Sequence, residues 1–135
     1  MTIKEIKQII INRILDDKKI LSYIDKDNRY CDRISDLKYN IIFDYFTLYY
    51  GYDFISVEVS EWESKTISVK GQKDFTVMIN LGLSNIYEKG ENKLDALSEN
   101  IERVINELFP NMTKYTNIPL HNDTRVIRQI SFDIM

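Results

Sequence analysis

The chain has little of what most catalytic and metal sites are built from. It contains one cysteine, Cys31, and one histidine, His121, in 135 residues. A single cysteine excludes an internal disulfide bond. A Ser-His-Asp or Cys-His site would have to use His121, which lies in a turn-like segment after Pro119. No pair of residues has the usual spacing of zinc ligands, so we expect neither a cofactor nor a bound metal.

Long apolar runs, linker residues and basic surplus are also scarce. Charges interrupt every short apolar run of the N-terminal MTIKEIKQIIINR, which argues against a signal peptide. No stretch approaches the ~20 apolar residues of a membrane-spanning helix. A net charge of −3 is not that of a typical nucleic-acid binder. With four Gly and two Pro, the length indicates a single domain over residues 1–135.

Apolar residues at three- and four-residue steps predict two amphipathic helices. The first covers residues 3–15, begins with Thr2 and Glu5 in capping-box spacing, and has one apolar face: Ile3, Ile6, Ile9, Ile10 and Ile14. Asp16 and Asp17 either interrupt this helix or cap a second short turn over residues 18–24. The second helix covers residues 92–109 and has the clearest period of the chain: Leu94, Leu97, Ile101, Val104, Ile105 and Leu108. Pro110 ends it.

Four segments have the composition or alternation of strands. Residues 39–52 are dense in β-branched and aromatic residues, which suits a strand covered on both faces or a strand with a packed aromatic loop. In residues 53–62 the apolar side chains share one parity, which is typical of a half-buried strand: Ile55, Val57 and Val59. The tail, residues 124–135, predicts a closing strand with Arg128 at the margin of its buried face and four apolar positions: Val126, Ile130, Phe132 and Ile134.

The remaining strand signal is a hairpin over residues 67–82. Ile67 and Val69 point one way, and a second alternating run follows: Phe75, Val77, Ile79 and Leu81. Turn-forming residues separate the two runs: Gly71, Gln72, Lys73 and Asp74. A hairpin alone is marginal in water, so it must belong to a larger sheet. The order α-β-β-β-β-α-β predicts an α+β domain with a mostly antiparallel sheet of four to five strands packed against two helices.

Two carboxylates beside an aromatic residue are the nearest approach to catalytic chemistry. Glu61 and Glu63 flank Trp62, and paired carboxylates beside an aromatic ring can cleave sugars. Acidic residues at a strand end more often form a solvated rim or guard the edge against pairing. A small hydrolase that uses Glu61, Glu63 or His121 is therefore a lesser alternative, and we expect the protein not to be an enzyme.

The order of these segments resembles that of the tail terminator proteins of tailed bacteriophages and phage-tail-like bacteriocins, also called tail completion or collar proteins. The resemblance covers most of the chain and is carried by the N-terminal helix, the aromatic strand, the hairpin around GQKD, LDALSENIERVINEL and TRVIRQISFDI. It implies an α+β subunit of a ring, typically a homohexamer. That ring caps the growing tail tube, stops its polymerisation and, in a true phage, joins the tail to the head.

The resemblance also implies the partners and the place of assembly. The partners would be further copies of the chain, the tail tube, the head-side connector in a phage and, as a further candidate, the tail sheath. Assembly would take place in the host cytoplasm and end in the virion or tail-like particle. We expect the hairpin to add its edge to a neighbouring subunit. Its tip is the predicted subunit contact: Lys70, Gly71, Gln72, Lys73 and Asp74.

A monomeric protein-binding module of the immunity or antitoxin type is the main alternative, because it would be equally acidic and equally free of catalytic groups. The distribution of charge bears on this choice. The first helix, residues 3–19, has five Lys or Arg against three Asp or Glu, whereas residues 92–108 have two against four. Opposite local charges can steer subunits head to tail, although two ordinary solvated helix faces would show the same pattern.

Overall fold

A computed structural model describes residues 1–24, 53–63, 73–84, 86–88, 91–121 and 126–134. Its helices and strands follow the chain in the order α1 (Ile3–Leu15), α2 (Lys18–Ser22), β1 (Phe54–Glu63), β2 (Lys73–Gly82), β3 (Tyr87–Glu88), β4 (Glu91–Asn92), α4 (Lys93–Leu108), β5 (Thr113–His121) and β6 (Val126–Ile134). The predicted strand over residues 39–52, the first run of the predicted hairpin with Ile67 and Val69, and Cys31 lie outside the described residues. No helix in the described ranges is long and apolar enough to cross a membrane.

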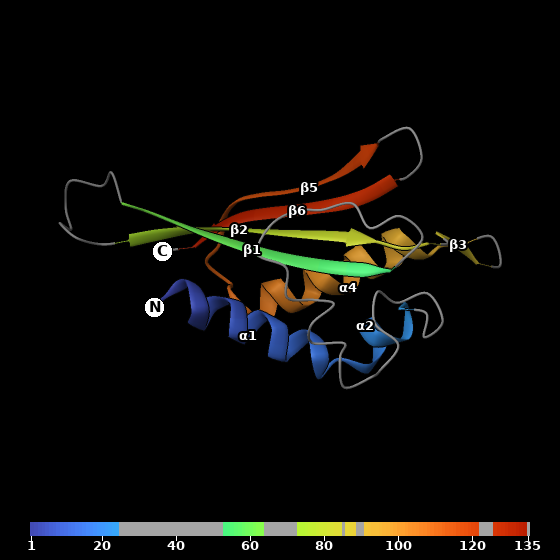
Figure 1. Cartoon of the computed structure of the whole chain (residues 1–135), viewed down its shortest axis with the longest axis horizontal. Helices are drawn as coiled ribbons and strands as arrows, with labels where there is room; N and C mark the ends of the chain where they lie inside the picture. Colours follow the sequence, from blue (N-terminus) through green and yellow to red (C-terminus); the bar gives the residue numbers. More distant parts are fainter. Residues whose placement is uncertain (25–52, 64–72, 85, 89–90, 122–125, 135) are drawn as a thin grey trace.

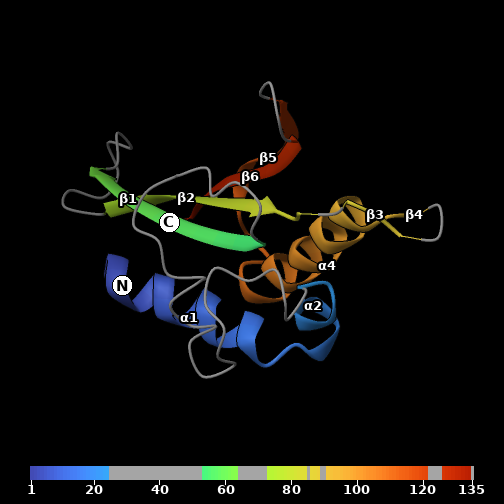
Figure 2. The ribbon, with the colours of Figure 1, turned by 45° about the vertical axis from the view of Figure 1, so that its right-hand side comes forward.

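Four of the strands form one antiparallel sheet in the order β1-β2-β6-β5, and β3 and β4 form a separate two-stranded ribbon. The α+β class with a mostly antiparallel sheet is therefore confirmed. The order of elements differs from the prediction at the C-terminal end, where α4 is followed by two strands instead of one. Figure 1 shows α1, α2 and α4 on one side of the sheet, and the turned view in Figure 2 agrees. We call the sheet face toward these helices the inner face and the opposite one the outer face.

Helix α1 begins and ends as the sequence predicts. The side chain of Thr2 caps it by accepting a hydrogen bond from the backbone N–H of Glu5, with a donor–acceptor distance of 3.1 Å. Its buried residues are Ile6, Ile10, Ile11 and Ile14. Ile9, which the period placed on the apolar face, is 40% exposed, and Ile11 is buried instead. Asp17 caps the short helix α2, so the second of the two predictions for Asp16 and Asp17 is confirmed.

Helix α4 also has the predicted extent and buried face. The side chain of Asn92 caps its N-terminus by accepting from the backbone N–H of Asp95 at 3.0 Å. The predicted apolar positions are buried, with Leu108 only partly so, and Ser98 joins them at 1% exposure. The helix packs against β2 and β6 and beside α1. Burying each of these leucine and isoleucine side chains contributes about 1.5–3 kcal/mol to folding, so this face holds α4 on the sheet.

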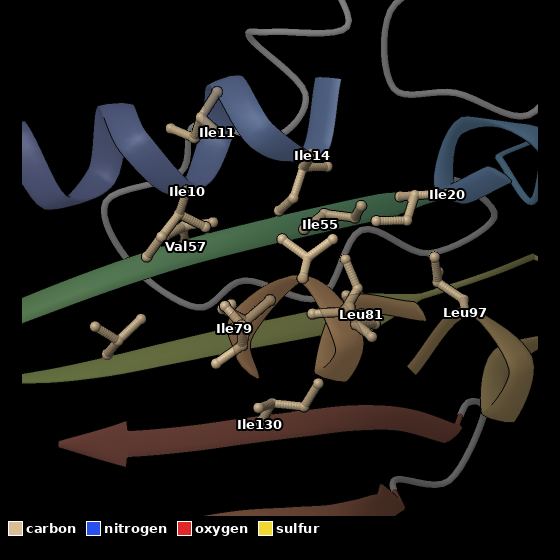
Figure 3. Close-up of a cluster of buried hydrophobic side chains, with 14 of the residues drawn as sticks. Ile10, Ile11, Ile14, Ile20, Ile55, Val57, Ile79, Leu81, Leu97 and Ile130 are labelled. Atoms are coloured by element: carbon tan, nitrogen blue, oxygen red, sulfur yellow. The ribbon is translucent and has the colours of Figure 1, made fainter. Parts of the chain in front are cut away.

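The core lies between the helices and the inner face of the sheet. Figure 3 shows Ile10 and Ile14 pointing from α1 toward Val57 and Ile55 of β1, with Ile79 and Ile130 on the neighbouring strands. Strand register explains this grouping, because Val57 lies opposite Ile79 and Ile79 lies opposite Ile130. Apolar side chains at alternate positions of three strands thus form one continuous surface under the helices.

The first half of β1 is buried on both faces, which differs from the half-buried strand that its alternation predicted. Ile55 and Val57 face the helices, but Phe54 and Ser56 on the outer face are only 2% and 1% exposed. Asn80, opposite Ser56 in β2, is fully buried as well. In β6 the same departure occurs at Ile127, which is 2% exposed although it belongs to the parity predicted to face solvent. Alternation therefore identified these strands but not the burial of their outer side.

Strand β5 was not predicted. The segment Thr113–His121 pairs with β6, with an irregularity in register between Thr113 and Thr116. Most of its residues are exposed or half-buried, and among the described strands it has only β6 as a neighbour. A strand at the border of a sheet needs little apolar alternation, and Pro119 made the segment look like a turn. His121, which we expected in an exposed loop, is exposed as the last residue of this strand.

Candidate interaction surface

Of the predicted contact tip, the structure describes only Lys73 and Asp74. Lys70, Gly71 and Gln72 lie outside the described residues, whereas Lys73 and Asp74 are the first two residues of β2. Asp74 is 5% exposed and lies opposite Trp62 of β1, and Lys73 lies opposite Glu63. The prediction that Lys73 and Asp74 belong to a turn is therefore wrong. Their role in subunit contact stays a prediction.

The predicted strand addition through the run from Phe75 to Leu81 is also contradicted. This run lies in β2, which is hydrogen-bonded to β1 on one side and to β6 on the other. Both of its edges are occupied over Phe75–Leu81, so it has no edge to offer a second subunit. Alternation showed that Phe75–Leu81 is a strand, but the identity of its neighbours depends on pairing with a segment more than forty residues later in the chain.

The structure separates the candidate histidine from the two candidate carboxylates. Glu61 is exposed in β1 opposite Phe75, at the end of the sheet where Phe75 pairs with Ile134, and Glu63 follows at the end of β1. His121 lies opposite Val126, at the other end of β6. Eight strand residues separate the two ends, roughly 26 Å at the usual rise per residue. A site combining these carboxylates with the imidazole is excluded. The described residues contain no group of three or more His, Cys, Asp or Glu placed to hold a metal ion.

Four side chains connect all four strands across the outer face, and we call them the outer-face ladder. The indole N–H of Trp62 in β1 donates to the hydroxyl of Thr76 in β2 at 3.0 Å. That hydroxyl donates to a carboxylate oxygen of Asp133 in β6 at 2.7 Å. The ammonium of Lys114 in β5 lies 3.7 Å from the other oxygen of Asp133 and 5.7 Å from the centre of the Trp62 ring. Each member therefore contacts two others.

Lys114, a member of the ladder, has an uncommon backbone conformation. Its φ angle is 53°, in the left-handed region that residues other than glycine rarely adopt. The register irregularity between Thr113 and Thr116 lies at the same place. A bulge of this kind redirects a side chain that a regular strand would place elsewhere. Here it brings the Lys114 ammonium over the Trp62 ring, where cation–π attraction and the Asp133 carboxylate both stabilise it.

The outer face combines features of protein-contact surfaces. Trp62 is the only tryptophan of the chain and is half-buried there, and aromatic residues are enriched at interfaces. Ile118 of β5, on the same face, is 45% exposed and is one of three large apolar side chains that are exposed in the described ranges. Among the described residues, the charged side chains on this face are the acidic Glu58, Asp74 and Asp133 and the basic Lys114. Nothing in this arrangement supplies a nucleophile with an adjacent base.

The border strand β5 is poorly suited to pairing with another strand. Pro119 has no backbone N–H, and Lys114 with its bulge twists the beginning of the strand. Proline and bulges at a sheet border are devices that prevent edge-to-edge association. A partner at this border would therefore contact side chains such as Ile118 rather than extend the sheet.

A second possible contact is a hollow of about 300 Å³ at the end of the molecule where both termini lie. It is lined by Met1, Leu108, Phe109, Pro110, Asn111, Met112 and Ile134. None of these side chains is acidic, basic or nucleophilic, so the hollow has the chemistry of an apolar contact and not of a catalytic centre.

Ion pairs join the helices to one another on the other side of the molecule. Arg103 of α4 and Arg13 of α1 lie 2.7 and 3.3 Å from one carboxylate oxygen of Asp17, and Arg13 also pairs with Glu107 at 2.8 Å. These four charges cancel. The unequal charges of the two helices therefore come from other residues, with Lys18 and Lys19 exposed near α1 and Glu99 exposed on α4.

Comparison of the chain with protein-family models, with curated proteins and with solved structures found no match.

Proposed function

We propose that the chain is a structural subunit that assembles into a homo-oligomeric ring and caps the end of a phage or phage-like tail tube. The observation that supports this most is the one-sided packing of the sheet. Both long helices lie on the inner face, and the outer face presents the ladder around Trp62 together with the exposed Ile118. A ring subunit needs contact surfaces and no catalytic group, and this layout offers such a surface.

The geometry limits how such a ring would form. Since β2 has two neighbours and Pro119 disfavours pairing along β5, we expect neither of these two strands to extend the sheet of a neighbouring subunit. A heterologous contact between the outer face of one copy and a different face of the next closes into a ring when its rotation is correct. The unequal charges of α1 and α4 would favour one orientation over others during encounter.

The test is the length of the tail tube in a strain that lacks the gene. A terminator stops polymerisation, so electron micrographs of the deletion strain should show tubes of uncontrolled length, and the intact gene should restore uniform tubes. Tubes of normal, uniform length in the deletion strain would contradict the proposal. In parallel, light scattering gives the mass of the purified protein alone and with purified tubes. A mass several times 16.1 kDa for the protein alone, or a gain of several subunit masses per tube over tubes alone, supports ring formation.

A monomeric protein-binding module stays the second candidate because one observation favours it. Pro119 and the bulge at Lys114 protect the β5 border of the sheet against strand pairing, as expected of a chain that functions alone. The mass measurement separates the two. A protein that stays monomeric at high concentration and also in the presence of tubes would favour the module, which would then use the outer face to bind its target.

A further inference from the structure

The part of the outer face around Trp62 already holds a lysine. The Lys114 ammonium lies 5.7 Å from the centre of the Trp62 ring and 3.7 Å from a carboxylate oxygen of Asp133. The other Asp133 oxygen accepts a hydrogen bond from the Thr76 hydroxyl at 2.7 Å, which orients the carboxylate. An aromatic ring face and a carboxylate are the groups that bind ammonium and guanidinium ions. Trp62, Thr76 and Asp133 therefore form a cation-binding site, and its occupant belongs to the same chain.

Lys114 is held in this site only loosely. Its side chain is 75% exposed, and its 3.7 Å ion-pair distance is longer than a hydrogen bond. An ion pair as exposed as this one contributes little to stability. The φ angle of 53° strains the backbone at Lys114, and residues strained in this way are concentrated at ligand-binding and switch regions. A second cation would therefore displace Lys114 at a small cost in free energy.

The charge of the outer face favours a basic partner. Among the described residues, this face has three acidic side chains, Glu58, Asp74 and Asp133, and one basic side chain, Lys114. Glu58 is half-buried and Asp74 is 5% exposed, and neither forms an ion pair within the described ranges. One oxygen of Asp74 is buried without a hydrogen-bond partner. Lys114 alone does not neutralise these acids, so the face attracts further positive charge.

A second copy of the chain offers that charge at the beginning of α2. Lys18 and Lys19 are adjacent and exposed, and neither forms an ion pair in the part of the chain that the structure describes. Lys4 is equally exposed, but it is a single charge next to the exposed Glu5. Figures 1 and 2 show α2 on the helix side of the sheet, at the end away from the point where β1 finishes and β2 begins. The acidic and the basic surface therefore lie at opposite ends and on opposite sides of one subunit.

We propose that Lys18 and Lys19 of one copy bind the site of Trp62 and Asp133 on the next copy and displace Lys114 from it. This inference rests on the proposed function, because it specifies the contact between subunits of the ring. The contact joins two different surfaces, so each copy keeps one surface of each kind for its neighbours, as a closed ring requires. In the single chain Lys114 covers the Trp62 ring, and in the assembly a lysine of the next copy replaces it.

The sign of one mutational effect tests the displacement. Lys114→Ala vacates the site and removes positive charge from the acidic face, so self-association should become about fivefold tighter. If Lys114 itself made the contact with the next copy, the same change would weaken association. Lys4→Ala is the matched control, because it removes an equally exposed charge elsewhere and should change the dissociation constant less than about twofold. Sedimentation velocity over a series of protein concentrations gives these constants.

Two neutralising variants test which surfaces meet. The first replaces both α2 lysines, Lys18→Gln with Lys19→Gln, and the second is Asp133→Asn, whose side chain can still accept from Thr76. Each should weaken self-association about tenfold or more. A mixture of the two retains one intact acidic and one intact basic surface, on different proteins. It should therefore form dimers of twice 16.1 kDa and nothing larger. If the wild type assembles only on tubes, the same variants are compared by the number of copies bound per tube.

Three results would each overturn this contact: a wild type that stays monomeric both alone and on tubes, weaker association of Lys114→Ala, or unchanged association of the α2 double variant. Absence of dimers in the mixture would also overturn it, because a contact between two different surfaces must be restored there. Failure of this inference can be told apart from failure of the proposed function. Tubes of uncontrolled length in the deletion strain, together with normal association of all these variants, would reject the contact and leave the terminator role in place.

Discussion

The Asp17 carboxylate combines a helix cap with two ion pairs, so its replacement should lower stability markedly. One oxygen accepts the backbone N–H groups of Lys19 and Ile20, each at 3.1 Å, and thereby caps α2. The other oxygen lies 2.7 Å from Arg103 and 3.3 Å from Arg13. The side chain is only 8% exposed, and it joins α1, α2 and α4 at one point.

The magnitude follows from two contributions. Loss of a helix cap costs about 1 kcal/mol. The ion pairs involve guanidinium groups that are 30% and 42% exposed, and such pairs are screened by solvent, so together they contribute about 1 kcal/mol. Asp17→Ala should therefore lower the free energy of unfolding by about 2 kcal/mol, which is roughly 6–10 °C in Tm for a domain of this size. Asp17→Asn can still cap the helix and should lose only about half as much.

Urea unfolding followed by circular dichroism gives both differences, and pH separates the contributions further. Burial alone would raise the pKa of Asp17, but hydrogen bonds from Arg103 and the Ile20 N–H and the charge of Arg103 outweigh it and lower the pKa below its ordinary value of 3.8. A lowered pKa means that the ionic contribution is fully present above about pH 4 and is lost as the pH falls through the folded-state value.

The advantage of the wild type over Asp17→Asn should therefore be constant near neutral pH and shrink below about pH 4. An Asp17→Asn protein as stable as the wild type at pH 7, or a difference between the two that grows on acidification, would refute this account of the ion pairs. An Asp17→Ala protein as stable as Asp17→Asn would refute the capping role instead.

Three further changes test the core, the tight strand contact and the outer face. Ile101→Ala should lower the free energy of unfolding by about 2–5 kcal/mol because Ile101 is fully buried. The control Asn106→Ala, on the exposed face of α4, should change it by less than about 0.5 kcal/mol. Urea denaturation measures both differences. In Gly82→Ala the added methyl would overlap the buried Phe54 ring, whose Cδ1 lies 2.8 Å from the methyl position, so calorimetry should show a loss of about 1–3 kcal/mol. Ile118→Asp should leave Tm within a few degrees but reduce the fraction of protein that co-sediments with tail tubes. The control Asn106→Asp should bind tubes as the wild type does. Unchanged tube binding by Ile118→Asp would show that Ile118 is not part of the contact surface.

The helices α1 and α4 and most of their buried residues could be predicted from the sequence, because the period of the apolar residues matches the face of each helix that is buried. Thr2 and Asn92 mark the beginnings of α1 and α4, and the apolar stripe of α4 faces the sheet as predicted. The error at Ile9 has a simple cause. Ile9, Ile10 and Ile11 are consecutive and equally apolar, so the choice between Ile9 and Ile11 depends on what surrounds the helix and not on the period.

The pairing of strands and the candidate surface were not readable in the same way. The sequence placed Phe75–Leu81 in a local hairpin with Ile67 and Val69, whereas the structure pairs it with Phe54–Glu63 and with β6. The outer-face ladder was not predicted because its four members lie in four separate strands. Each occupies an outward-facing position that shows nothing unusual in the sequence. The Thr76–Asp133 hydrogen bond joins residues that are 57 positions apart in the sequence, so no local sequence pattern predicts it. Only the single tryptophan between two glutamates hinted at a special position.

The described polar contacts occur mainly at the borders of the apolar core. We infer that the core and these polar contacts have different roles: the core stabilises the fold, and the polar contacts orient its elements. Asp17 joins the outer sides of the helices, the ladder crosses the outer face, and the Asn117–Ser98 hydrogen bond connects β5 to α4. The solvent-exposed contacts among them add little to stability, and we expect them to favour one arrangement of the elements over others. Core variants such as Ile101→Ala should therefore change the amount of folded protein. Ladder variants such as Thr76→Val should instead change where Trp62 and Lys114 lie, and with them any contact made by the outer face.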